Sequence, residues 1–98
     1  MNHLGIKIKE LREKRKFLLR QVAAHLECDT ALISKVERGE RNLSREQIEK
    51  LAFLFRVEAE ELITLWLAEK VIHVIGDDPL AERGVKRALN NLKSLPHL

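Results

Sequence analysis

The residues with the clearest chemical potential lie between positions 21 and 39, where two short amphipathic helices are separated by a polar turn. The second helix, over residues 30–38, carries the apolar side chains Ile33 and Val36 on one side and small or basic ones on the other. Small polar and basic groups on an exposed helix can hydrogen-bond the edges of base pairs. The pattern indicates a helix that docks on a core with one face and enters the major groove of DNA with the other.

The basic charge of the chain is concentrated in the same half. The 98 residues carry a net charge of +3, but residues 1–56 hold 13 Lys and Arg against 8 Asp and Glu, whereas residues 57–98 hold 5 against 7. Basic charge attracts phosphate whatever the base sequence. Charge alone would fit an ordinary solvated surface. Its coincidence with the two-helix segment favours double-stranded DNA as a partner.

Helical periodicity places this segment within an all-α chain. Strands are poorly supported, because aromatic residues are few and β-branched runs are short. Apolar residues recur at helical spacing in six stretches, at about residues 3–16, 19–26, 30–38, 45–55, 58–75 and from 79 to near 95. The buried stripes of the first four are expected to hold Leu4, Ile8, Leu11, Val22, Ala23, Leu26, Ile33, Val36, Ile48, Leu51, Ala52 and Phe55.

Capping residues mark the ends of several of these helices. Asp29 can accept the free amides at the start of the second helix of the pair, and Gly39 suits its end. Ser44 begins a capping box for the following helix. Asp78 and Pro79 predict the start of the last helix, with Asp78 as the cap and Pro79 in the first turn.

The segment from residue 62 to residue 75 is apolar on more than one face, and a small bundle can bury only one stripe of such a helix. Exposed contiguous apolar surface usually marks an interface. We therefore expect a homodimer, with the last helix packing alongside; the alternative is that the last helix covers this surface within one chain. The expected interface residues are Trp66, Leu67, Val71, Ile72, Val74 and Ile75.

The run from Gln21-Val22-Ala23 to Ile33-Ser34-Lys35-Val36-Glu37-Arg38-Gly39 resembles the helix-turn-helix domain of phage repressors and Cro proteins, the XRE family. The resemblance covers about residues 4–65. It implies a five-helix bundle, here with an extended fifth helix and an additional C-terminal helix. The resulting organisation is a DNA-binding domain over residues 1–65 and a helical, dimerising extension of the same domain over residues 66–98. Family members bind palindromic sites as dimers, with half-sites about one helical turn apart.

The resemblance also assigns roles by position. Lys35 would donate to guanine, Thr30 would bond a base or phosphate, and the Ala31 methyl would touch thymine. Ser34 lies beside them and completes the expected base contacts, and Leu32 is either a thymine contact or a partly buried residue. The expected contacts to the DNA backbone are Arg20, Gln21, Arg38, Arg41, Asn42 and Arg45.

Four positions depart from the family pattern. Leu18 stands where the helix cap is usually Ser or Thr, and Leu19 replaces a Gln that bonds phosphate, a contact that Arg20 or Gln21 would have to supply. Glu27 and Arg56 each replace a turn glycine. A non-glycine residue in the left-handed conformation is strained by roughly 1 kcal/mol or more.

Other classes of function find little support. No Ser/His/Asp order, carboxylate pair or glycine-rich phosphate loop stands out, so we expect no enzymatic activity. The histidines His3, His25, His73 and His97 have no metal-ligand spacing to one another or to Cys28, so no metal or other cofactor is expected and Cys28 is interpreted as a buried thiol. No apolar run approaches the ~20 residues of a transmembrane helix. We expect a cytoplasmic protein without a membrane partner or a small-molecule ligand.

Two functional hypotheses follow. The first is a sequence-specific DNA-binding transcriptional regulator, of the repressor or restriction-modification controller type, that binds a palindromic operator as a homodimer. The second is an antitoxin-like or adaptor protein whose main partner is another protein. The apolar segment near the C-terminus and the loss of the usual Gln at Leu19 favour the second.

Overall fold

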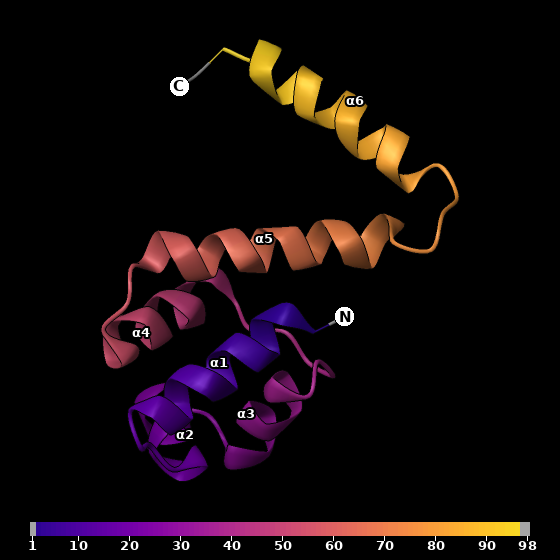
Figure 1. Cartoon of the computed structure of the whole chain (residues 1–98). Coiled ribbons are helices and arrows are strands. Elements are labelled where there is room, and N and C mark those ends of the chain that lie inside the picture. Colours follow the sequence, from indigo (N-terminus) through magenta and orange to yellow (C-terminus); the bar gives the residue numbers. More distant parts are fainter. Residues whose placement is uncertain (1, 97–98) are drawn as a thin grey trace.

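The computed structural model describes residues 2–96, which form six α-helices and no strand. His97 and the end of the expected extension lie outside the described residues. The all-α fold is confirmed, with a helix-turn-helix bundle that continues into a long fifth helix and a separate sixth one (Figure 1). The helices are α1 (His3–Lys14), α2 (Leu19–His25), α3 (Thr30–Glu37), α4 (Arg45–Phe55), α5 (Ala59–Ile75) and α6 (Ala81–Ser94).

One hydrophobic core holds α1 to α4 and the first half of α5 together. All twelve apolar residues expected in the core are buried, and Leu43, Leu62 and Ile63 join them. Phe55 lies at the end of α4, fully buried, with its ring 6.2 Å from that of Phe17. Its burial is worth about 1.5–3 kcal/mol, so this corner fixes α4 against the turn that precedes α2.

The expected caps explain where α3 and α4 begin. The Asp29 side chain accepts the backbone N–H of Leu32 at 2.8 Å. Ser44 and Gln47 form the reciprocal capping box, with distances of 3.2 Å and 2.9 Å between the bonded atoms. Gly39 follows α3 with φ of +79°, the left-handed conformation that glycine adopts without strain.

The expected start of the last helix was wrong. Asp78 accepts the N–H of Leu80 at 2.8 Å, which closes a local turn instead of capping the helix, and α6 begins two residues after Pro79, at Ala81. The first helix is also shorter than expected. It ends at Lys14 because Lys16 turns the chain with φ of +60°.

Glu27 and Arg56 adopt the left-handed conformation that glycine would occupy in the family pattern. Their φ values are +56° and +57°, so the turn geometry is kept at a cost in strain. Arg56 ends α4 in this way, and its backbone N–H bonds the carbonyl of Phe53 at 3.3 Å.

The second half of α5 and all of α6 leave the bundle. α5 contributes Leu62 and Ile63 to the core, whereas α6 has no buried residue. α6 diverges from α5 after the turn over residues 76–80 and lies on the side of α5 opposite to α1–α4 (Figure 1). The expectation that the last helix packs alongside α5 is therefore not met within one chain, since α6 meets α5 only near the turn.

Candidate nucleic-acid interface

The α3 helix presents two chemically distinct faces. Ile33 and Val36 are buried in the core. Thr30, Ala31 and Lys35 are exposed on the opposite side, and Ser34 is half-buried between them. The residues expected to contact bases thus lie together on the solvent face of one short helix. Leu32, expected to be either a thymine contact or a partly buried residue, is half-buried against the core.

The N-terminus of α1 holds the end of α3 in place. The Asn2 amide donates to the backbone carbonyl of Glu37 at 2.7 Å, while its carbonyl oxygen accepts the N–H of Gly5 at 3.1 Å. A Cβ on Gly5 would lie 2.5 Å from the carbonyl oxygen of Val36, so the two backbones touch directly. These contacts fix the end of α3 against the start of α1.

An ion pair reinforces this contact. Arg12 of α1 bonds Glu37 of α3 at 2.7 Å, and both side chains are mostly buried. Arg12 also donates to the carbonyl of Phe17 at 3.1 Å, which fixes the turn before α2. The hydrogen bond to Glu37 raises the pKa of Arg12 above its ordinary value despite partial burial. Neither this pair nor Asn2 was identified from the sequence, because no local spacing links residues 25 or 35 positions apart.

The start of α2 differs from a fully capped helix. Leu18 has no side-chain acceptor, so it cannot cap the first turn of α2. The Gln21 side chain accepts the N–H of Leu18 at 2.7 Å, which completes half of the reciprocal cap. Gln21 and Arg20 are both exposed, and the amide nitrogen of Gln21 remains oriented by this bond. The two residues expected to replace the missing phosphate contact lie at the exposed start of α2.

The C-terminal end of α3 carries a polar network that includes a predicted DNA contact. Arg38 donates to the hydroxyl of Ser34 at 2.7 Å and to the carboxylate of Glu40 at 2.6 Å. The hydrogen bond from Arg38 lowers the pKa of Glu40 below its ordinary value. Glu40 was missed from the sequence. In the free protein it holds Arg38, so phosphate would have to compete with a carboxylate for this guanidinium.

The loop after α3 exposes its polar residues around one buried anchor. Arg41, Asn42 and Arg45 are exposed, whereas Leu43 is buried. The Leu43 carbonyl accepts the indole N–H of Trp66 at 2.8 Å. The anchor keeps the exposed donors of the loop beside the end of α3, where the contacts to the DNA backbone were expected.

The expected dimer surface is exposed along most of its length. Leu67, Val71, Ile72 and Val74 are exposed, and Ile75 is half-buried. Trp66 differs from the rest, because its ring packs against the core and lies 4.4 Å beneath the ammonium of Lys70. Trp66 therefore belongs to the bundle at the point where the free part of α5 begins.

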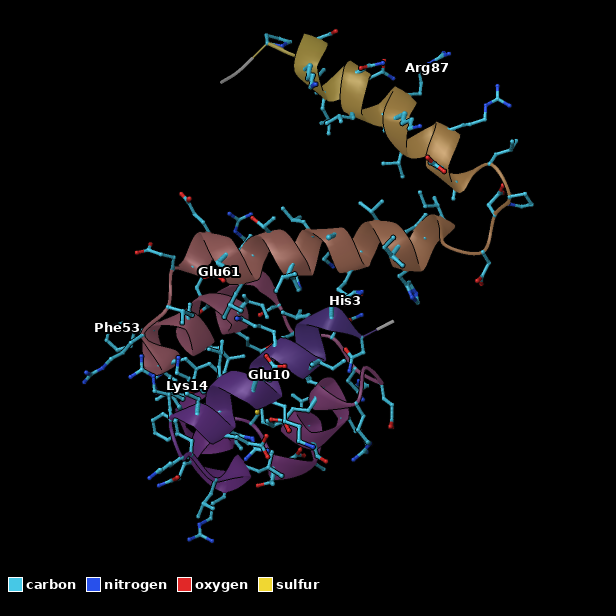
Figure 2. The ribbon with its side chains drawn as sticks, viewed as in Figure 1. His3, Glu10, Lys14, Phe53, Glu61 and Arg87 are labelled. Atoms are coloured by element: carbon cyan, nitrogen blue, oxygen red, sulfur yellow. The ribbon has the colours of Figure 1, made fainter. Side chains whose placement is uncertain are left out.

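Figure 2 shows the side chains around these surfaces, with Phe53 projecting outward from α4 and Arg87 on the side of α6 that faces away from α5.

Cys28, expected to be buried, is half-buried in the turn before α3. Burial raises the pKa of its thiol, with a further contribution from the charge of Asp29.

The described residues offer neither a metal site nor a membrane-spanning helix. Residues 2–96 contain no group of three or more His, Cys, Asp or Glu side chains placed to hold a metal ion. Within the same range, every helix is too short or too polar to cross a membrane.

One comparison with known proteins agrees with this geometry. A family model described as a helix-turn-helix domain matches residues 3–65, which is most of the chain and includes α1 to α4 and the start of α5. No curated protein and no solved structure matches the chain.

Proposed function

The chain belongs to the helix-turn-helix domain family of DNA-binding proteins, and from this we propose a sequence-specific transcriptional regulator that binds a palindromic operator as a homodimer. We propose further that it is of the phage-repressor and Cro type, as a repressor or a restriction-modification controller. The observation that carries the proposal is the exposed polar face of α3, which stands opposite a fully buried apolar face.

The proposed base contacts follow from the chemistry of that face. Lys35 is exposed and can donate to the O6 and N7 atoms of guanine. Thr30 can hydrogen-bond a base or a phosphate at the N-terminal end of α3, and the Ala31 methyl can pack against the methyl group of thymine. A helix that enters the major groove commonly reads bases through its N-terminal residues.

Ser34 has a more specific role in the proposal. Its hydroxyl oxygen already accepts a hydrogen bond from Arg38, so its own proton remains to be donated. A hydrogen-bond donor at this position favours bases that present an acceptor in the major groove, such as guanine through O6 or N7 and thymine through O4. Arg38 would act here by orienting Ser34 as well as by attracting phosphate.

The proposed backbone contacts flank α3 on both sides. Arg20 and Gln21 lie at the start of α2, and Arg41, Asn42 and Arg45 lie in and after the loop that follows α3. Contacts of this kind fix the register of the protein on DNA and make its affinity fall with salt. We expect the cationic members of this set to contribute to the salt dependence and to contribute little to the choice of sequence.

The proposal is tested by replacing Lys35 and Thr30 with Ala and measuring the affinity for a selected operator and for unrelated DNA across a range of salt. We expect each change to cut the discrimination between operator and unrelated DNA by ~1–3 kcal/mol, with little effect on folding. Lys14→Ala at the end of α1 is the matched control, because it also removes one exposed positive charge but is not among the residues expected to contact DNA. Absence of DNA binding by the unmodified chain at low salt would defeat the proposal.

A second candidate is an antitoxin-like or adaptor protein whose main partner is another protein. The exposed apolar residues of α5 and α6 favour it. The two candidates differ in what the Lys35→Ala change does. An adaptor keeps its protein partner when Lys35 is replaced and loses it when the apolar surface of α5 is made polar.

A further inference from the structure

Most of the exposed apolar surface of the protein lies on two helices that leave the bundle. Nine of the twelve large apolar side chains that are exposed among the described residues lie between Leu67 and Leu95. These side chains do not cover one another, since residues as far apart as Val71 on α5 and Leu92 on α6 are about half exposed. Exposed apolar surface concentrated in this way marks an interface.

The free part of α5 carries two apolar seams. Leu67, Val71 and Val74 are spaced four and three residues apart, and so are Ala68, Ile72 and Ile75. Spacing of this kind forms a straight seam along a helix, and each seam accommodates one neighbouring helix. The seams are turned about 100° from each other, because they are offset by one residue. α5 therefore has room for two neighbours here.

α6 carries one broad apolar stripe. Ala81, Val85, Ala88, Leu92 and Leu95 are spaced alternately four and three residues apart, with Leu89 beside them. Arg87, on the opposite side of α6, points away from α5 (Figure 2), so the stripe is on the side of α6 that faces α5. A single α6 can fill one seam of α5 and leaves the other open.

The net charges of α5 and α6 indicate which helices should be neighbours. α5 carries Glu60, Glu61 and Glu69 against Lys70, a net charge of −2, with Glu60 and Glu61 in its first turn and Glu69 bonded to the N–H of Leu4. α6 has Glu82 and four basic residues, a net charge of +3. Contacts between two α6 helices would bring like charges together, whereas an antiparallel α6 brings its last turn, with Lys93, toward the acidic first turn of α5. The second seam of α5 is thus suited to another α6, which a second copy of the chain supplies.

We propose that two copies of the chain join α5 and α6 into an alternating four-helix bundle, in which each α6 lies between two α5 helices. This arrangement specifies how the homodimer of the proposed function is built. It rests on the proposed function only in requiring that the chain forms a homodimer. The five residues between α5 and α6 make neighbouring helices antiparallel. A two-fold axis along such a bundle puts both α1–α4 units at the same end, where they can reach one DNA molecule.

The test compares charge introduced on the apolar stripe with the same charge on the polar face of α6. Light scattering should give the unmodified chain twice its monomer mass of 11.4 kDa. Leu92→Arg, Val71→Arg and Ile72→Arg should each return the mass to that of the monomer, because the stripe and both seams are buried in the proposed bundle. Asn90→Arg, on the polar face of α6, should leave the dimer intact.

The same samples separate a lost interface from a lost fold. The amide NMR signals of the α1–α4 core should remain dispersed in all four variants, since none of these positions contributes to the core. A monomeric unmodified chain, or a Leu92→Arg variant that keeps the dimer mass, would overturn the four-helix arrangement. DNA binding by such a monomer at low salt would leave the proposed DNA-reading function standing.

Disulfide cross-linking tests whether α5 and α6 helices alternate around the bundle. In a Cys28→Ser background, copies with Val85→Cys are mixed with copies carrying Val71→Cys or Ile72→Cys. The antiparallel arrangement puts Val85 level with these two residues, so one of the mixtures should form a disulfide-linked heterodimer. Efficient linkage between two copies of the Val71→Cys or Ile72→Cys chain alone would show α5 packed on α5, which contradicts the proposal.

Discussion

Arg12 and Glu37 form a two-point ion pair between α1 and α3. Arg12 Nε donates to Glu37 Oε2 at 2.7 Å and Arg12 Nη2 donates to Glu37 Oε1 at 3.1 Å. The Glu37 side chain is only 7% exposed and that of Arg12 only 13%. Two parallel bonds fix orientation as well as distance. The pair therefore ties the helix that we propose reads DNA to the first helix of the bundle.

Removing one partner of this pair should destabilise the fold. We expect Arg12→Ala or Glu37→Ala to lower the free energy of unfolding in urea by about 2–3 kcal/mol, because a mostly buried charge loses its partner. Replacing both residues by Leu should cost less than the sum of the two single changes. A Glu37→Ala chain as stable as the unmodified one would show that the pair contributes nothing.

The close approach of α1 to α3 should make Gly5 intolerant of a side chain. In Gly5→Ala the new Cβ would lie 2.5 Å from the backbone carbonyl oxygen of Val36, which cannot rotate away. Overpacking of this kind costs about 1–3 kcal/mol, measurable by urea unfolding. Gly84→Ala is the control, because nothing lies within 4 Å of its Cβ, and it should raise the helicity of α6 by far-UV circular dichroism. Equal stability of Gly5→Ala and the unmodified chain would contradict the observed packing.

The left-handed conformation of Glu27 predicts a stabilising substitution. Glu27→Gly relieves the strain at φ of +56°, whereas Glu27→Ala removes the same carboxylate and keeps the strain. We expect the Gly variant to be more stable than the Ala variant by about 1 kcal/mol in thermal unfolding. If the Ala variant proves the more stable of the two, Glu27 does not hold this conformation in solution.

The thiol of Cys28 should be protected from alkylation in a pH-dependent way. Its folded pKa is raised by burial, so less of the reactive thiolate is present in the folded chain than in the unfolded one. The rate of reaction with iodoacetamide at neutral pH should be lower for the folded chain than for the same chain in urea. The difference should shrink as pH rises through the folded pKa. Equal rates at neutral pH would contradict this environment.

The sequence was sufficient to predict the elements that depend on local patterns. Apolar spacing identified the stripes of α1 to α4, and Asp29 and Ser44 marked helix starts because caps act within three residues. The same logic failed at Asp78, where a cap residue followed by Pro79 closes a turn and α6 begins later. A cap signal does not distinguish a single turn from the first turn of a helix.

Interactions between distant segments could not be predicted. The Glu69 side chain on α5 accepts the N–H of Leu4 at 2.9 Å and so caps α1 from another helix. Asn2 and Arg12 reach α3 in the same way. The spacing of residues along the sequence indicates none of these hydrogen bonds, because each depends on how the helices pack. The direction in which α6 leaves the turn over residues 76–80 likewise follows from no local pattern.

The most direct test of the proposed function is selection of bound sites from random double-stranded DNA by the full chain. We expect an enriched pseudo-palindrome whose half-sites are about one helical turn, roughly 10 base pairs, apart. Lys35→Ala should relax the preference at a base pair of each half-site and leave the spacing unchanged. Recovery of DNA with no enriched sequence, from an unmodified chain with a folded core, would contradict the claim that α3 reads DNA.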